Sequence, residues 1–278
     1  MRIADYPPQE PLSPAGQAYH DALLSRTPAD PAVELAYGED PSQGLLLYPA
    51  AKPGGDILFF VHGGGWTSGY KEWMAFMAPS FVAAGVNFVS AGYRLAPHYL
   101  FPTGFEDCCQ ALARAITAAT MHGADPGRVF IGGHSAGGHY TALMAARRDW
   151  QNRVGLPADV VRGCLPISGV FRFGAGSGLS TWPRFLGPAD MPDAPARAKA
   201  ASPIDQIAAP SPFLIAYGTR DFPHLITQAV EMAAALRAAG GEATELVLEG
   251  CDHFSASLAG GEADGPWLRQ ALAWMAAH

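Results

Sequence analysis

The segment Gly133-His134-Ser135-Ala136-Gly137 follows the apolar run at residues 129–132 and opens an alanine-rich helical pattern that reaches about Arg148. Small residues beside a serine permit a sharp turn from a strand into a helix, and such a turn exposes the serine hydroxyl. A G-x-S-x-G sequence indicates a nucleophilic serine only where it lies between a strand and a helix. Here a strand-like segment precedes it and a helix-like segment follows it. The segment therefore predicts a strand–turn–helix unit that presents Ser135 as a nucleophile.

The composition is that of a globular chain with one large core. It has 278 residues, of which 49% are hydrophobic and 15% charged, a normal length for a single α/β domain. The net charge of −7 argues against a nucleic-acid partner and offers no basic stripe to a membrane. No apolar run approaches the roughly 18 residues of a membrane span, and the N-terminus lacks a signal-peptide core. We therefore expect a cytoplasmic protein, with its four cysteines reduced.

Strand-like and helix-like segments alternate along the chain. The expected strands are residues 33–37, 45–48, 56–62, 86–93, 129–132, 163–170, 213–217 and 243–249. The expected helices are residues 71–84, 105–122, 136–148, 225–239 and 266–277. Strands too apolar to face water, alternating with helices, predict an α/β fold: a mostly parallel eight-stranded sheet with helices on both faces. We expect one domain over residues 1–278.

Two segments lie outside this alternation. Residues 1–32 form a proline-rich leader, and residues 171–212 form a long irregular connection rich in Gly, Pro and Ala. A connection of that length inside a compact domain is often a lid or a pocket wall. The leader is a candidate to pack over the same pocket mouth. The alternative is that both segments are plain surface loops.

A serine hydroxyl needs a base, and the base needs an orienting acid. In a parallel sheet these groups belong on loops at the carboxyl ends of strands, in the order Ser, Asp or Glu, His. Asp221 and His253 follow the last two expected strands in that order. We therefore predict a catalytic triad of Ser135, Asp221 and His253.

Alternatives to this triad stay open in the sequence. His253 would otherwise be a surface-loop histidine, and Asp221 the N-cap of the helix at residues 225–239. Asp252 is a second candidate for the acid and Glu249 a third, although adjacent side chains in an extended loop point apart.

The segment His62-Gly63-Gly64-Gly65-Trp66 directly follows the third expected strand. Bare backbone there can approach a substrate oxygen, so Gly64 and Gly65, together with the N–H of Ala136, are predicted to form an oxyanion hole. The alternative is an ordinary glycine turn. A phosphate-binding loop is excluded, because no Lys-Ser or Lys-Thr follows the glycines.

Other reactive side chains receive structural interpretations. His134 and His139 are expected to shape the turn, and Cys251 to be structural. The remaining histidines lack the close spacing of metal ligands, so we expect no metal and no cofactor. A small-molecule substrate is expected to meet an aromatic pocket built from Trp66, Phe171, Trp182, Phe222 and Phe254.

These motifs resemble the α/β-hydrolase superfamily, in its branch with an HGGG-type loop. Segments 62–66, 93–97 and 133–137 resemble hormone-sensitive-lipase-type carboxylesterases, whereas segments 132–139, 167–171 and 252–254 resemble kynurenine formamidases (arylformamidases). The resemblance implies an acyl-enzyme mechanism on a small N-formyl arylamide or a carboxylic ester. A non-catalytic binding protein on the same fold is a remote alternative.

Two departures favour the formamidase-like reading over a small-acyl carboxylesterase. The leader is short for the cap of lipase-type esterases, and His134 stands where those enzymes tend to carry an acidic residue. Against this, the segment Tyr93-Arg94-Leu95-Ala96-Pro97 is more esterase-like. Arg172, Arg184 and Arg220 are the candidates to hold a substrate carboxylate. The resemblance also leaves a homodimer open.

Overall fold

The computed structural model describes residues 2–28, 33–180 and 182–278. Met1 and residues 29–32 of the predicted leader, and Thr181 of the predicted lid segment, lie outside the described residues.

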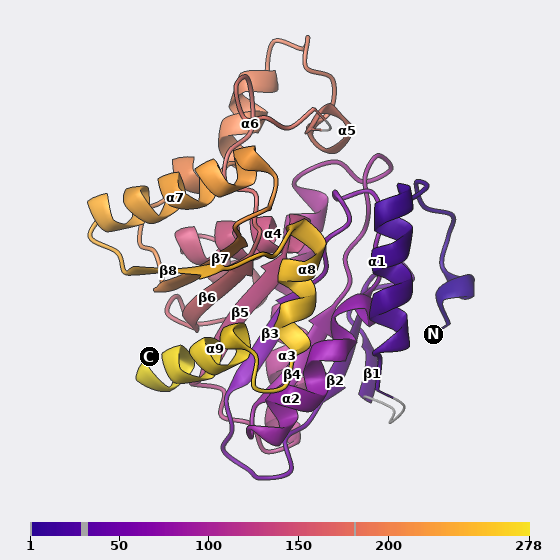
Figure 1. Ribbon diagram of the computed structural model, residues 1–278, viewed down its shortest axis with the longest axis vertical. Helices are drawn as coiled ribbons and strands as arrows, with labels where there is room; N and C mark the ends of the chain where they lie inside the picture. Colours follow the sequence, from indigo (N-terminus) through magenta and orange to yellow (C-terminus); the bar gives the residue numbers. More distant parts are fainter. Residues whose placement is uncertain (1, 29–32, 181) are drawn as a thin grey trace.

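An eight-stranded sheet in the order β1-β2-β4-β3-β5-β6-β7-β8 forms the centre of the molecule (Figure 1). Its strands are β1 (Val33–Ala36), β2 (Gly44–Tyr48), β3 (Ile57–Val61), β4 (Asn87–Ala91), β5 (Val129–His134), β6 (Val161–Ile167), β7 (Phe213–Gly218) and β8 (Ala243–Leu248). β2 pairs antiparallel with β1 and β4, and all other neighbouring pairs are parallel. The predicted mostly parallel eight-stranded sheet is confirmed.

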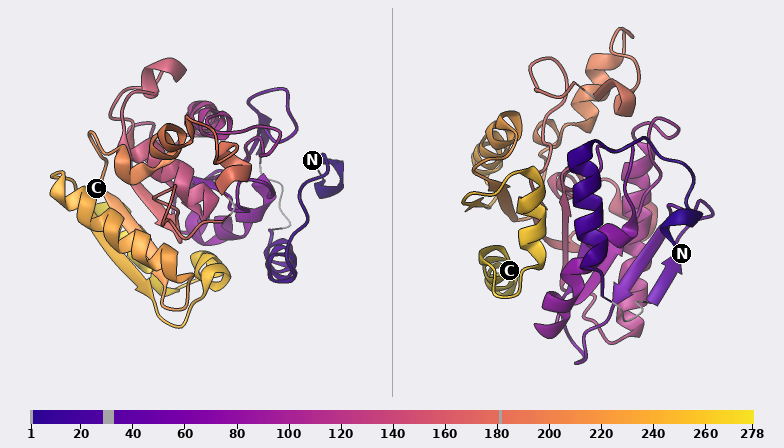
Figure 2. Two further views of the ribbon diagram at one scale, coloured as in Figure 1. Left: turned by 90° about the horizontal axis from the view of Figure 1, so that it is seen from above. Right: turned by 45° about the vertical axis from the view of Figure 1, so that its right-hand side comes forward.

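Two sets of helices cover the two faces of this sheet. One face packs against α3 (Thr103–Met121), α4 (Ala136–Ala146) and α7 (Pro223–Ala238). The other face packs against α1 (Pro14–Ser25), the 3₁₀ helix η2 (Lys71–Met77), α2 (Ala78–Ala83), α8 (His253–Leu258) and α9 (Pro266–Ala277). The helices α5 (Trp182–Leu186) and α6 (Ala194–Ala201) lie beyond the carboxyl ends of the strands, as Figure 2 shows.

Strand β3 shows why the central strands are so apolar. Alternate residues of a strand point to opposite faces, and here both faces are covered by helices. Phe59 therefore packs on the side of α3 and α4, whereas Phe60 packs on the side of α2 and α9. Both side chains are fully buried. Their packing fixes the carboxyl end of β3, from which the glycine loop continues.

Helices α5, α6 and α8 were not expected, and two segments nearer the N-terminus also differ from expectation. The single helix expected at residues 71–84 is a 3₁₀ helix followed by α2, because Pro79 in the first turn of α2 has no N–H to continue an α-helix from before it. Helix α1 was not expected in the leader. It begins at Pro14, and the N-cap before it is Ser13, whose Oγ accepts a hydrogen bond from Gly16 N.

Among the described residues, no helix has both the length and the apolar character needed to cross a bilayer.

Candidate active site

A strained turn between β5 and α4 carries Ser135. β5 ends at His134, α4 begins at Ala136, and Ser135 between them has φ 54° and ψ −115°. This left-handed φ is unfavourable for a residue with a side chain, and it persists only where the surroundings enforce it. Gly137 provides part of that enforcement: a Cβ there would lie 2.1 Å from the carbonyl oxygen of Val61, so only glycine lets α4 pack this closely on β3.

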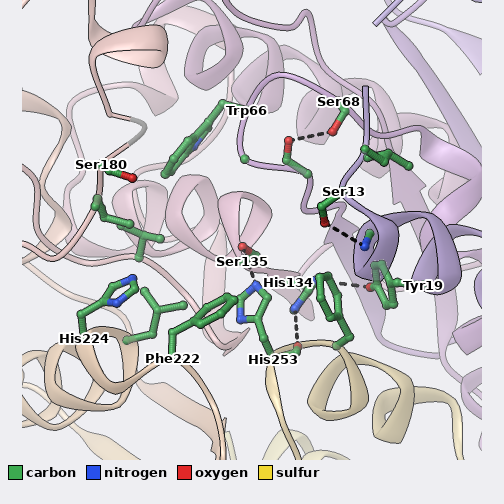
Figure 3. Close-up of a pocket in the computed structure, with 18 of the residues that line it drawn as sticks. Ser13, Tyr19, Trp66, Ser68, His134, Ser135, Ser180, Phe222, His224 and His253 are labelled. Atoms are coloured by element: carbon green, nitrogen blue, oxygen red, sulfur yellow. Dashed lines mark hydrogen bonds between the residues drawn. The ribbon is translucent and has the colours of Figure 1, made fainter. Parts of the chain in front are cut away.

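Ser135, His253 and Asp221 form a continuous chain of hydrogen bonds. Oγ of Ser135 lies 3.1 Å from Nε2 of His253, and Nδ1 of His253 lies 2.9 Å from Oδ1 of Asp221. Figure 3 shows His253 directly beneath the serine. In this arrangement Nδ1 of His253 keeps its proton and donates a hydrogen bond to Asp221, which leaves Nε2 free to take a proton from the serine hydroxyl.

The orienting carboxylate is buried and held in place. Asp221 is 4% exposed, in the loop after β7, and its Oδ1 also accepts the backbone N–H of Phe222 at 2.7 Å. Burial pushes the pKa of Asp221 upward. The hydrogen bond and charge of His253, together with hydrogen bonds from Ser168 and the backbone of Phe222, outweigh burial, so the pKa lies below its usual value. Asp221 therefore stays ionised beside the imidazole.

The two other acid candidates lie elsewhere. Asp252 is the N-cap of α8, where its side chain accepts the backbone N–H groups of Phe254 and Ser255. Glu249 is exposed, and its nearest hydrogen-bond partner is Thr219. Of the three carboxylates predicted as candidates, the structure brings only Asp221 to His253.

The glycine loop after β3 has a shape that only glycine permits. Gly64 has φ +107°, and a Cβ on it would lie 2.0 Å from the carbonyl oxygen of Ser68. Within the described parts of the chain, no protein acceptor receives the backbone N–H of Gly64, Gly65 or Ala136. Both glycines line the same cavity as Ser135. These three N–H groups are thus available to an oxyanion formed at the serine.

A cavity of about 490 Å³ surrounds Ser135, a volume typical of small-molecule sites. Figure 3 shows that it extends to both sides of the serine: Trp66, Phe222 and His224 lie on one side, Ser13 and Tyr19 on the other. The described residues that line it include no Asp, Glu, Lys or Arg side chain. The cavity thus offers apolar walls, hydroxyls and imidazoles.

The predicted aromatic pocket is partly corrected by these positions. Trp66, Phe222 and Phe254 line the cavity, but Phe171 and Trp182 do not. Phe171 is fully buried in the core, where its ring covers Gly169 and its backbone N–H bonds to Gln228. Trp182 packs against the edge of the same core at the start of α5.

The three arginines proposed as carboxylate ligands also lie outside the cavity lining. Arg172 pairs with Glu231, and Arg184 pairs with Glu10 of the leader. The third, Arg220, is exposed and lies near Asp252.

The leader was a candidate to pack over the pocket mouth, and residues 171–212 were a candidate lid or pocket wall. Parts of both line the cavity, but the sequence did not identify most residues of one wall. That wall comes from the leader and α1, and the opposite side adds a loop of the 171–212 segment. The lining residues not foreseen are Pro11, Leu12, Ser13, Gly16, Tyr19, Ser68, Trp73, Val170, Gly178, Leu179, Ser180, His224 and Leu225. The Ser13-Pro14 pair was a readable helix-start signal for that wall.

Three fully buried histidines frame the site. His139 accepts the indole N–H of Trp66 at Nδ1 (3.1 Å) and hydrogen-bonds the carbonyl of Ala201 through Nε2 (2.8 Å), which fixes the indole that walls the cavity. Burial lowers the pKa of His62 to about 4 and that of His134 and His139 to about 3. All three are therefore neutral in the folded protein at neutral pH.

These histidines predict a loss of stability in mild acid. An unfolded histidine takes up a proton near pH 6.5, whereas the folded chain keeps these three neutral down to about pH 4 or below. Well below pH 6.5 each removes about 1.4 kcal/mol per pH unit, and the three together remove about 5 kcal/mol between pH 6.5 and 5. The midpoint of urea unfolding should therefore be much lower at pH 5 than at pH 7.

A variant pair isolates this effect. His139→Gln should flatten the dependence of the urea midpoint on pH, whereas His98→Gln, which alters an exposed side chain, should leave it unchanged. Equal midpoints at pH 7 and pH 5 would show that the three imidazoles do not stay neutral in the fold.

The described residues contain no group of three or more His, Cys, Asp or Glu side chains placed to hold a metal ion. A strained serine turn, a serine–imidazole–carboxylate chain and free N–H groups beside them together define the class of site found in serine hydrolases.

The chain belongs to the alpha/beta hydrolase fold family, whose model matches residues 58–256. It is 29% identical to the esterase LipC of Mycobacterium tuberculosis over 236 residues, which are 79% of this chain and 58% of LipC. It is 40% identical to the arylacetamide deacetylase of Bos taurus over 93 residues, which are 32% of this chain and 23% of the deacetylase. The chain thus matches about a quarter of the deacetylase and somewhat more than half of LipC.

Solved structures agree on the fold. The propionate-bound esterase Est2 of Thermogutta terrifontis superposes with a TM-score of 0.73 at 21% identity, covering 90% of this chain and 96% of that one. A truncated carbohydrate esterase from gut microbiota superposes with a TM-score of 0.73 at 19% identity, covering 90% of this chain and 98% of that one. The predicted α/β-hydrolase fold is confirmed, and the named relatives accord with the carboxylesterase side of the predicted resemblance.

Proposed function

We propose that the chain is a serine carboxylesterase that hydrolyses small uncharged esters through an acyl-enzyme. The observation that carries the proposal is the Ser135–His253–Asp221 chain opening into a cavity whose described lining has no acidic or basic side chain other than histidine. The relationship to LipC, which is named an esterase, supports it.

The reaction follows from these contacts. Oγ of Ser135 attacks the ester carbonyl while Nε2 of His253 takes its proton, and the N–H groups of Gly64, Gly65 and Ala136 receive the oxyanion. The carbon–oxygen bond to the alcohol breaks, and His253 returns the proton to the leaving group. Water then attacks the acyl-serine, again with His253 as base, and releases the acid and the free serine.

An uncharged aryl amide, such as an N-formyl arylamide, is the second candidate substrate. The aromatic lining by Trp66, Phe222 and Phe254 favours an aryl group, and one relative is named an arylacetamide deacetylase. The aniline lone pair is delocalised into the ring, so such an amide is easier to cleave than an alkyl amide. A kynurenine-type substrate is disfavoured, because its carboxylate would find no cationic partner in the cavity lining.

A substrate series tests the proposal. We expect kcat/KM to decrease from p-nitrophenyl acetate to formanilide, and to be lower again, by about tenfold or more, for N-formylkynurenine. The blank is the Ser135→Ala variant. If N-formylkynurenine were the best substrate, the proposal would be wrong and a carboxylate-binding site would have to exist outside the lining described above.

A further inference from the structure

A line of polar contacts leads from helix α1 to the backbone of His253. Oγ of Ser257 lies 2.7 Å from the hydroxyl of Tyr19, and that hydroxyl lies 3.3 Å from Nδ1 of His134. Nε2 of His134 lies 2.9 Å from the carbonyl oxygen of His253. Figure 3 shows Tyr19 and His134 side by side, with His253 next to them. All three side chains of this line are at most 4% exposed.

One arrangement of hydrogens satisfies all three contacts with neutral groups. A carbonyl oxygen can only accept a hydrogen bond, so Nε2 of His134 carries a proton and donates a hydrogen bond to the carbonyl of His253. Nδ1 is then an acceptor, and Tyr19 donates its hydroxyl proton to it. The hydroxyl of Ser257 donates to Tyr19 in turn. The line therefore has a fixed direction, from α8 through α1 to the turn that holds the serine and back to α8.

We propose that Tyr19 and His134 are positioning residues that hold the backbone of His253 at the distance its imidazole needs from Ser135. This inference rests on the function proposed above and makes α1 part of the catalytic arrangement as well as a wall of the cavity. His134 is the neighbour of Ser135 in the chain, so its one side chain ties the serine turn to the first residue of α8.

Small displacements at such a point have large effects. A shift of about 1 Å between reacting groups is enough to lower a rate by about 100-fold. His253 starts a helix of only six residues, so that helix alone gives its backbone little rigidity. Its own ring nitrogens are engaged by Ser135 and Asp221, and the hydrogen bond from His134 reaches its backbone carbonyl instead.

The charge state of His134 fits this role. Its ring centroid is 4.7 Å from that of His253, so a proton on His134 would oppose the imidazolium that forms on His253 during the reaction. The titratable groups that face His134 are His253 on α8, Asp221 after β7 and Tyr19 on α1. Burial and the charge on His253 lower the pKa of His134, while Tyr19 supplies the donor that its neutral form accepts.

The test is the Tyr19→Phe variant, with Tyr70→Phe as a matched control. Both tyrosine rings pack on Trp73 with centroids 5.8 Å apart, but Tyr70 is not among the described residues that line the cavity. For p-nitrophenyl acetate we expect Tyr19→Phe to lower kcat by about tenfold, the effect of one lost buried hydrogen bond, with KM within about twofold. Tyr70→Phe should leave both constants unchanged.

A second pair of variants provides a rescue. Gln at position 134 keeps an N–H near the place of Nε2, whereas Leu has none, so His134→Gln should keep a kcat about tenfold above that of His134→Leu at similar melting temperatures. Tyr19→Phe matching Tyr70→Phe in kcat, or changing KM alone, would overturn the positioning role while the esterase proposal stood. A wild-type chain with no hydrolysis above the Ser135→Ala blank would overturn both.

Discussion

Ser135→Ala is expected to lower kcat for p-nitrophenyl acetate by about 10⁴- to 10⁶-fold without unfolding the protein. The hydroxyl is the only group on the turn that can form the acyl-enzyme, and it lies 3.1 Å from Nε2 of His253. Residual turnover would come from water attacking substrate polarised by the backbone N–H groups. The measurement is steady-state hydrolysis beside a thermal melt of each protein.

Cys251→Ala is the control for this experiment, because it removes the other nucleophilic side chain close to His253 in sequence. Burial raises the pKa of the Cys251 thiol, which keeps it protonated and unreactive. We expect its kcat to stay within about twofold of the wild type. If Ser135→Ala retained full activity while Cys251→Ala lost it, the nucleophile assignment would be refuted.

Asp221→Asn has the second largest expected effect, a loss of about 10⁴-fold in kcat with little change in KM. An amide at this position donates as well as accepts, so it lets the His253 ring take the tautomer with its proton on Nε2. That nitrogen then cannot accept the proton of Ser135. Activity should be measured at several pH values. Raising the pH removes a proton from a charged His253 ring, but it frees Nε2 only in molecules whose neutral ring carries its proton on Nδ1.

Asp252→Asn is the matched control, since the same substitution is made in the other carboxylate near His253. Asp252 caps α8, and asparagine caps a helix about as well as aspartate does. We expect no more than a few-fold change in kcat. Equal losses in the two variants would mean that both carboxylates act on His253 through its helix, and that the hydrogen bond to Asp221 has no special role.

The parts of the site that the sequence predicted are those specified by local chain geometry. The turn at Ser135 needs small residues on both sides, and these stand together in the chain. Asp221 and His253 were placed by counting strands, because the carboxyl ends of parallel strands meet at one edge of the sheet. In the structure His253 is the first residue of a short helix. The only helix-start signal before it is the N-cap Asp252, which is a weak signal on its own.

The parts that were missed depend on contacts between distant segments. Tyr19 reaches the site only because α1 packs across η2 and α8, and no local pattern reports that arrangement. Phe171 and Trp182 have the same aromatic character as Phe254, yet they point into the core and its edge. Which aromatic residues face a cavity is decided by tertiary packing, and their residue type does not reveal it.

The central claim is that Ser135 is the group that becomes acylated. The most direct test is to treat the protein with diethyl p-nitrophenyl phosphate, an organophosphate that transfers its phosphoryl group to activated serines, and to locate the adduct by peptide mass spectrometry. We predict one adduct, on Ser135, formed in step with loss of esterase activity and absent from Asp221→Asn on the same timescale. An adduct on a different residue, or inactivation with Ser135 unmodified, would contradict the account.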